Sequence, residues 1–190
     1  MKDKIRVTGL SGSLRRGSYN TACLRAAKEL EPEGMELEIA DISGIPFFNA
    51  DVEARGIPAA VDEFKKKLGE ADAILIATPE YNYSIPPVLK NALDWASRGK
   101  YMPLDGKPLA IMSASTGMLG GARAQYHLRQ VCVRLNMLPI NRPEVFIANA
   151  DKKFDEEGNL TDEYLRNLIS QLLLELYERT IEILDLRNMK

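Results

Sequence analysis

Short apolar runs recur along the chain, separated by glycine, proline and charged residues. The run from Ala71 to Thr78 is almost wholly apolar, which is typical of a central parallel strand covered on both faces. Residues Met35 to Ile42 instead alternate between apolar and polar side chains, which indicates a half-exposed strand near a sheet edge. We expect strands at residues 5–10, 35–42, 71–78, 107–115 and 145–147.

A helical period of apolar positions follows each of these runs. The first predicted helix starts at about Ser18 or Asn20, both good N-cap residues, and ends at about Pro32. Pro86 and Pro87 suit the start of another helix, because proline is tolerated in the first helical turn. The remaining helices are expected over residues 61–68, over residues 128–135 and from Thr161 through Leu176.

Five strands that alternate with five helices predict an α/β fold in a single domain, residues 1–190. This pattern gives a parallel sheet with helices on both faces, joined by right-handed crossovers. Residues 43–58 contain prolines and glycines without a clear period and predict a long loop. The charged residues 151–159 predict an excursion at the surface.

The near balance of charge argues against several classes of partner. The net charge is -2 with a pI of about 5.6. The sequence has no stripe of basic residues interleaved with aromatic residues, so no nucleic-acid partner is expected. No apolar run approaches the ~20 residues that cross a bilayer, so no membrane insertion is expected. The first residues lack the layout of a signal peptide, which predicts a cytoplasmic protein.

The two cysteines, Cys23 and Cys132, suggest buried side chains rather than a disulfide framework or a metal site.

The loop after the first strand, residues 11–20, has the composition of a phosphate cradle. Its glycines free backbone N–H groups, the helix that follows favours an anion, and Arg15 and Arg16 can add positive charge. It is not a Walker A loop, because no Gly-Lys-Ser/Thr follows, and its glycines lack the dinucleotide-binding spacing. It also has no cysteine that could serve as a phosphatase nucleophile. The alternative is a tight, serine-rich turn with a good N-cap.

Two further loops leave the carboxyl ends of predicted strands. Residues 79–87 combine two tyrosines, an asparagine and prolines into a platform suited to a flat heteroaromatic ring. Residues 113–121 are small and flexible, which lets a ligand approach the main chain closely. Judged alone, the second loop is better explained as a proline-rich connection whose tyrosines cover a helix end. The third loop, judged alone, could equally be an ordinary glycine-rich turn between a strand and a helix.

In an open doubly wound sheet, ligands bind outside the carboxyl ends of the strands, so the three loops are expected to converge. A loop that can bind phosphate, a loop with aromatic side chains and a loop of small residues together predict a mononucleotide site, and FMN fits such a site best. No side chain is predicted to be catalytic, because hydride transfer belongs to the flavin. The expected cofactor-binding residues are Ser11, Ser13, Leu14, Arg15, Arg16, Gly17, Ser18, Tyr19, Asn20, Pro79, Glu80, Tyr81, Asn82, Tyr83, Ser115, Thr116 and Gly117.

At these residues the sequence resembles the NADPH-dependent FMN reductases, and in particular their chromate and quinone reductase branch. The first motif is Gly-Ser-Leu-Arg-Arg-Gly-Ser-Tyr-Asn at residues 12–20, and the second is Pro-Glu-Tyr-Asn-Tyr-Ser-Ile-Pro at residues 79–86. The third is Leu-Lys-Asn-Ala-Leu-Asp-Trp-Ala-Ser-Arg at residues 89–98. The resemblance covers nearly the whole chain in order and spacing.

The resemblance implies a flavodoxin-like fold, tightly held FMN and a homodimer or homotetramer. It implies two-electron reduction of quinones, chromate, azo compounds or free flavin at the expense of NADPH or NADH. By this likeness, the phosphate contacts are Ser13, Arg15, Ser18 and Asn20. The ring and ribityl contacts are Glu80, Tyr81, Asn82 and Tyr83, with Ser115 at the ring's other edge. Pro87 stands where the family motif often has glycine, which bears on the following helix rather than on the flavin site.

Two rival functions stay open at the level of sequence. An FMN-binding electron carrier would take electrons only from a partner protein, but such carriers usually have a strongly acidic rim, whereas the charge here is close to balanced. A flavin-free binder of phosphate or nucleotide would use the same first loop. No arginine cluster can be assigned to a 2′-phosphate, so both NADPH and NADH are kept as co-substrates.

Three residue sets outside the loops also carry expectations. His127, the one histidine, is expected at the surface or at a subunit interface, and Trp95 in the core. Arg123 shares the predicted helix of His127 and belongs to a subunit contact or to a solvated face. The terminal helix carries a wide apolar face at residues 172–177, which indicates a subunit interface or a wide groove on the same chain.

Overall fold

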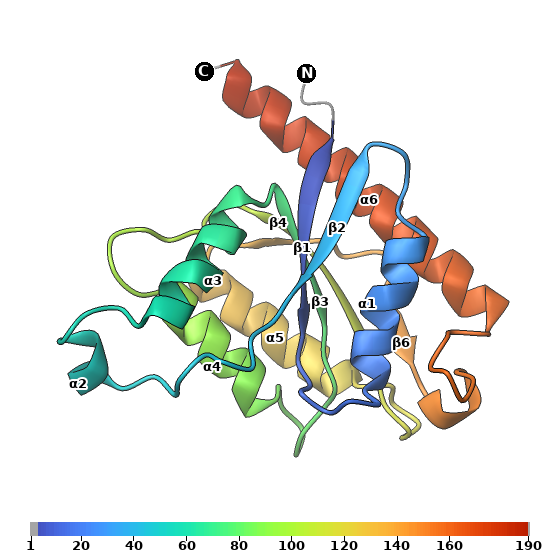
Figure 1. Ribbon diagram of the computed structural model, residues 1–190. Helices are drawn as coiled ribbons and strands as arrows, with labels where there is room; N and C mark the ends of the chain where they lie inside the picture. The colour runs from blue at the N-terminus through green and yellow to red at the C-terminus, as the bar shows by residue number, and fades with distance from the viewer. Residues whose placement is uncertain (1–3, 190) are drawn as a thin grey trace.

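The computed structural model describes residues 4–189, and a parallel six-stranded sheet forms its centre (Figure 1). The strands are β1 (Ile5–Ser11), β2 (Met35–Ala40), β3 (Ala73–Ala77), β4 (Pro108–Ala114), β5 (Leu138–Pro139) and β6 (Val145–Ile147). Their order is β2-β1-β3-β4-β5, with β6 also paired to β4, and every pairing is parallel. This is the strand order of the flavodoxin-like doubly wound fold, so the predicted fold class is confirmed.

Helices cover both faces of the sheet (Figure 1). They are α1 (Tyr19–Glu29), α2 (Ala50–Glu53), α3 (Ala59–Glu70), α4 (Pro87–Ala96), α5 (Ala122–Arg134) and α6 (Glu163–Asn188), with a 3-10 turn η1 (Ala150–Lys152). Helices α1 and α6 pack on one face, whereas α3, α4 and α5 pack on the other. Each face therefore has its own hydrophobic core.

The burial pattern of the strands follows the predicted one. All five residues of β3 are buried, and its side chains alternate between the two cores, with Leu75 on the α1 side and Ile74 and Ile76 on the α3 side. Strand β2 lies at the sheet edge, and its Glu36 and Glu38 are exposed. All seven residues of β4 are buried too. Complete burial of one large aliphatic side chain contributes about 1.5–3 kcal/mol, so β3 and β4 are the best-anchored strands.

Three helix starts have the predicted chemistry. The Ser18 side chain caps α1 by accepting the N–H of Thr21. Asp162, one residue after the predicted start, caps α6 by accepting the N–H of Leu165 over 3.0 Å. Helix α4 starts at Pro87, where a missing N–H costs nothing because the first turn has no intrahelical acceptor for it.

Three short elements were not predicted. Helix α2 lies within the expected loop of residues 43–58, η1 lies at the start of the expected surface excursion, and β5 adds a sixth strand to the expected five. Strand β5 is a two-residue element that contains a proline, and α2 has four residues and no buried side chain. Neither is long enough to show a period in the sequence.

The terminal helix α6 turns most of its wide apolar face toward its own sheet. Leu172 and Leu173 are buried, and Tyr177 packs against the same core, whereas Leu174 is 47% exposed. Packing against the sheet of the same chain therefore accounts for most of the wide apolar face of α6. Among residues 4–189, no helix combines the length and the apolar character needed to cross a membrane.

Candidate cofactor-binding site

The three predicted loops meet at the carboxyl edge of the sheet, at the bottom of Figure 1. They leave β1, β3 and β4, which are neighbours in the sheet. The first loop is bonded to the end of β3, because the N–H of Gly12 donates to Ala77 O over 2.8 Å. A Cβ atom at Gly12 would lie 2.6 Å from Thr78 Oγ1 and 3.2 Å from Pro79 Cδ, so glycine lets the first loop approach the start of the second this closely.

The first loop (residues 11–20) offers backbone donors beside exposed basic side chains. Within residues 4–189, the N–H groups of Leu14, Arg16 and Gly17 have no hydrogen-bond acceptor. Arg15 and Arg16 are exposed next to them. Free N–H groups and cations at a helix N-terminus favour an anion, so the predicted phosphate cradle has the donors that it requires.

Hydrogen bonds inside the first loop hold its serines in place. Ser18 Oγ accepts the N–H of Thr21 over 3.3 Å, and Ser11 Oγ lies 2.8 Å from Thr21 Oγ1. Ser13 is half-buried, and its hydroxyl accepts the N–H of Arg15 over 3.4 Å. A hydroxyl that accepts one hydrogen bond can still donate another, so Ser13 remains able to bind an anion.

The buried Asn20 joins the first loop to the end of β4. Its Oδ1 accepts the N–H of Ala114 over 2.9 Å, and its Nδ2 donates to Ala114 O over 2.9 Å. Asn20 is 3% exposed, so both bonds are shielded from water. The structure thus gives this side chain a fastening role that the sequence pattern, which suggested a phosphate contact, did not predict.

Tyr19 and Arg15 form the outer side of the first loop. The guanidinium carbon of Arg15 lies 5.5 Å from the centroid of the Tyr19 ring, which is a cation–π distance. The Tyr19 ring also packs against Phe154, with the two centroids 5.2 Å apart. These contacts keep one loop arginine beside the start of α1, close to the free N–H groups.

The second loop (residues 79–87) contains a tight turn that exposes Asn82 and Tyr83. Tyr81 and Ser84 exchange two backbone hydrogen bonds of 2.9 Å, and φ is 48° at Asn82 and 70° at Tyr83. Positive φ at both central residues is the geometry of a type I′ turn. Asparagine adopts this conformation readily, whereas in tyrosine it costs about 1 kcal/mol or more.

Glu80 fastens the second loop to α5. Its carboxylate accepts the N–H of Ala124 over 3.2 Å, in the first turn of a helix whose N-cap residue, Gly121, has no side chain to do so. The same carboxylate forms an ion pair with Arg123 and raises the pKa of that guanidinium, chiefly by accepting its hydrogen bond. The guanidinium carbon of Arg123 lies 3.6 Å from the centroid of the Tyr83 ring.

The sequence pattern did not predict this assembly. It suggested a subunit contact or a solvated face for Arg123, and it suggested a flavin contact for Glu80. The Glu80 side chain is only 7% exposed and is engaged with the helix start. His127 is exposed, as predicted, and its Nδ1 lies 2.8 Å from Ser84 Oγ, so α5 meets the second loop again one turn later. The one available signal was the helix start at Gly121, which needs a cap from elsewhere.

The third loop (residues 113–121) is held at its base by Ser113. The Ser113 hydroxyl donates to Gly120 O over 2.6 Å and accepts from Gln125 Nε2 over 2.8 Å. At Gly120, φ is 57°, and a Cβ atom there would lie 2.9 Å from Ala148 N. The base of the loop is therefore fixed in a backbone conformation that requires glycine.

A groove of about 500 Å³ runs between the second and third loops. This volume lies in the range of small-molecule sites. Met118 and Leu119, which the sequence pattern did not single out, line the groove and are exposed. The predicted residues in its lining are Glu80, Asn82, Tyr83, Ser115 and Gly117. Pro79, Tyr81 and Thr116 belong to the same loops outside this lining.

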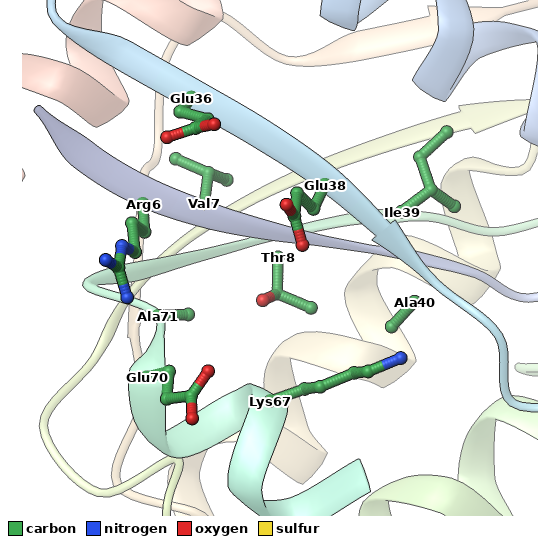
Figure 2. A pocket seen from close by; sticks show the side chains of 10 residues that line it. All are labelled: Arg6, Val7, Thr8, Glu36, Glu38, Ile39, Ala40, Lys67, Glu70 and Ala71. Atoms are coloured by element: carbon green, nitrogen blue, oxygen red, sulfur yellow. The ribbon is translucent and has the colours of Figure 1, made fainter. Parts of the chain in front are cut away.

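A second hollow, of about 230 Å³, lies between the edge strand β2 and the end of α3 (Figure 2). Its charged side chains are of both signs, and they are Arg6, Lys67, Glu36, Glu38 and Glu70. It lies away from the three loops. Charged side chains on an edge strand oppose pairing with another sheet, which accounts for Glu36 and Glu38 on β2.

Both cysteines are buried, as predicted, and burial raises the pKa of each thiol to about 12. Cys23 and Cys132 are therefore protonated at neutral pH, and they lie on α1 and α5 rather than in the three loops. In the part of the chain that the structure describes, no group of three or more His, Cys, Asp or Glu side chains could hold a metal ion.

Residues 5–152 match the sequence profile of the NADPH-dependent FMN reductases. The chain belongs to this family. Within it, an NAD(P)H-dependent FMN reductase of Pseudomonas aeruginosa is 55% identical over 183 residues, which cover 95% of this chain and 99% of that protein. An NADPH:quinone oxidoreductase of Arabidopsis thaliana is 48% identical over 190 residues, which cover 96% and 95% of the two chains.

Solved structures agree with this assignment. FerB, a flavoenzyme NAD(P)H:(acceptor) oxidoreductase from Paracoccus denitrificans, has a TM-score of 0.85 and 29% sequence identity, with 94% of this chain and 98% of that chain covered. The predicted oxidoreductase class, the FMN cofactor and the nicotinamide co-substrate are thereby confirmed for this member of the NADPH-dependent FMN reductases.

Proposed function

We propose that the protein transfers two electrons from NAD(P)H, through FMN bound at the three loops, to quinones. The proposal rests on one observation: the first loop, with its free N–H groups, and the groove between the second and third loops lie at the same edge of the sheet. Chromate, azo compounds and free flavin are further acceptors that stay predictions.

The first loop fits the phosphate of FMN. The N–H groups of Leu14, Arg16 and Gly17, the hydroxyl of Ser13 and the guanidinium of Arg15 would hold it. Ser11, Ser18 and Asn20 would act behind them, because their side chains are already bonded to the loop and to β4. Removing Ser13 and Arg15 together is expected to release FMN while the sheet and its two cores stay intact.

The second and third loops fit the ring of the cofactor through their main chains. In the third loop the N–H of Ser115 is bonded to Ile147 O over 3.0 Å, and that of Gly117 to Ser115 Oγ over 3.1 Å. Within residues 4–189, the N–H of Thr116 has no such acceptor, nor has that of Asn82 in the second loop. We therefore propose the N–H groups of Asn82 and Thr116 as main-chain donors to the ring.

When bound, FMN supplies the hydride and electron chemistry of the reaction. The chain contributes binding and orientation, since Glu80 and Arg123 neutralise each other at the groove and no side chain there is assigned as a proton donor. The groove has no excess of acidic side chains. This favours an enzyme that binds a nicotinamide over an electron carrier that docks on a basic partner protein.

The same proposal includes the state of the protein in the cell. We expect one domain over residues 1–190, a cytoplasmic location and a homodimer or homotetramer.

Anaerobic mixing of the FMN-loaded protein with NADPH, followed by addition of a quinone, tests the function. The flavin absorbance is expected to bleach with NADPH and to return with the quinone. A flavin that stays oxidised would instead assign the protein as an electron carrier, and protein that takes up no FMN would assign it as a flavin-free binder. A Ser13→Ala, Arg15→Ala double variant that retains FMN as well as the wild type would show that the phosphate lies elsewhere.

A further inference from the structure

We propose that the exposed ring of Tyr83 is the surface on which a neutral, planar quinone stacks, and that Glu80 positions this ring through Arg123. The inference rests on the proposed function and names the residue of the same site that would receive the quinone. It assigns the Tyr83 side chain to the acceptor, whereas the likeness in sequence places Tyr83 among the flavin contacts.

The backbone at Tyr83 is the first reason. Its φ of 70° is a conformation that glycine or asparagine adopts more easily than tyrosine. Asparagine followed by glycine is the favoured pair for a type I′ turn, so the turn itself gains nothing from a tyrosine. Strained residues persist at functional sites, where surrounding contacts hold them in place. What tyrosine brings to this position is its ring.

The support beneath the ring is the second reason. Arg123 lies over one face of Tyr83 at 3.6 Å, yet Tyr83 stays 71% exposed, which leaves the other face open. Arg123 is held by Glu80, whose side chain is 7% exposed and is itself held by the N–H of Ala124. The ring is thus fixed from the start of α5, and a fixed aromatic surface binds a flat ligand with little loss of conformational entropy.

The charge of the groove is the third reason, and it selects the class of acceptor. Glu80 and Arg123 are the charged residues in the described lining, and they form an ion pair with each other. Met118 and Leu119 add apolar surface to the same lining. A neutral quinone ring meets aromatic and apolar surface there, whereas a dianion such as chromate meets a cation that is already paired.

The main test replaces Tyr83 by glycine in the FMN-loaded protein. Tyr83→Gly relieves the backbone strain and removes the ring, so the thermal midpoint is expected to stay or to rise. The dissociation constant of a neutral naphthoquinone for the oxidised holoenzyme, and its KM, are expected to rise about tenfold. FMN retention and the KM for chromate are expected to change by less than about twofold. Tyr83→Phe, which keeps the ring, is expected to bind the quinone like the wild type.

Glu80→Gln tests the positioning role. The amide oxygen can still accept the N–H of Ala124, but the ion pair with Arg123 is lost. The quinone dissociation constant is expected to rise about threefold in the wild-type background and not at all in the Tyr83→Gly background, because coupled residues are non-additive. Glu53→Gln, which removes a comparable Glu–Arg pair remote from the groove, is the matched control and is expected to leave quinone binding unchanged.

Two results would overturn the inference. One is a Tyr83→Gly variant that keeps FMN and binds the quinone as tightly as the wild type, since the ring would then not be the stacking surface. The other is a Glu80→Gln effect of the same size in both backgrounds, since Glu80 would then not act through Tyr83. A wild-type holoenzyme that NADPH fails to reduce would remove the proposed function alone, because the quinone-binding measurement needs no turnover and still decides the role of Tyr83.

Discussion

Two clusters, each made of a glutamate, an arginine and an aromatic residue, connect different parts of the chain. Glu53 of α2 binds Arg98 just beyond α4, and Arg98 lies 5.1 Å from the centroid of the Phe48 ring. Glu80 of the second loop binds Arg123 of α5, and Arg123 lies 3.6 Å from the Tyr83 ring. Each consists of a glutamate, an arginine and an aromatic ring, but only the second borders the groove.

The two clusters differ in burial and in what the aromatic ring does. The Glu53 side chain is 20% exposed, against 7% for Glu80, and only Glu80 also caps a helix. Phe48 packs edge-on against the buried Trp95, with ring centroids 5.0 Å apart, whereas Tyr83 is 71% exposed. The same three side-chain types therefore serve the fold at α4 and leave a ring free for a ligand at α5.

Buried asparagines brace the cofactor site at the first loop and the region around Phe48, and replacing them should have the largest effects. Asn20→Ala breaks the two buried bonds to Ala114 that tie the first loop to β4. We expect the free energy of unfolding to fall by about 2 kcal/mol, because two buried peptide groups lose their partners. We also expect FMN affinity to fall about tenfold, because the cradle is no longer held against β4. Urea unfolding and FMN titration measure the two effects.

Asn91→Ala is the counterpart in the remote region. Asn91 Oδ1 accepts the N–H of Phe48 over 2.7 Å, and its Nδ2 donates to Pro46 O over 2.9 Å. We expect a loss of about 1 kcal/mol in the free energy of unfolding, because Pro46 O keeps its hydrogen bond from Trp95 Nε1 and only the N–H of Phe48 loses its partner. FMN and quinone affinities are expected to equal those of the wild type. Asn167→Ala, at an exposed position of α6, controls for the substitution itself. Weaker FMN binding in Asn91→Ala would show that the two regions are coupled.

Phe48→Ala should show, by a smaller change in stability than that of Asn20→Ala, that the rings of Phe48 and Tyr83 have different roles. It removes the edge-on contact with Trp95 and the contact with Arg98. We expect the free energy of unfolding to fall by about 1 kcal/mol, with quinone binding unchanged. Tyr83→Gly is expected to show the opposite pattern, with stability kept and quinone binding weakened. If both variants lost stability alone, the distinction between the two clusters would be wrong.

The parts of this architecture that the sequence predicted are those that depend on neighbouring residues. Continuous apolar runs, such as the one that contains Ile74 to Ile76, locate the buried strands, and a serine followed by an apolar period locates the start of α1. Helix α2 was missed because four residues are too few to show a helical period, although Asn49 caps the helix locally. Its contact with the rest of the fold, the bond between Glu53 and Arg98, joins residues that are far apart in the sequence.

The same division applies to the candidate site. The three loops were predicted because each carries its own composition of glycine, hydroxyl and aromatic residues. The fastening contacts were not predicted, because they join residues far apart: Asn20 and Ala114 are separated by 94 positions, and Glu80 and Arg123 by 43. The strand order brings these distant residues together, and the strand order could not be used to pair particular side chains from the sequence alone.

The smallest expected effect is the salt dependence of the two ion pairs. Raising the ionic strength from about 0.1 M to about 1 M shortens the Debye length from about 10 Å to about 3 Å. We expect the coupling between Glu53 and Arg98, measured by a double-mutant cycle on stability, to weaken over this range. The coupling between Glu80 and Arg123 should change less, because the Glu80 carboxylate is nearly excluded from solvent and is also bonded to the N–H of Ala124. Equal salt dependence of the two pairs would mean that the burial of Glu80 does not distinguish them, and that the ring of Tyr83 is held no more firmly than the ring of Phe48.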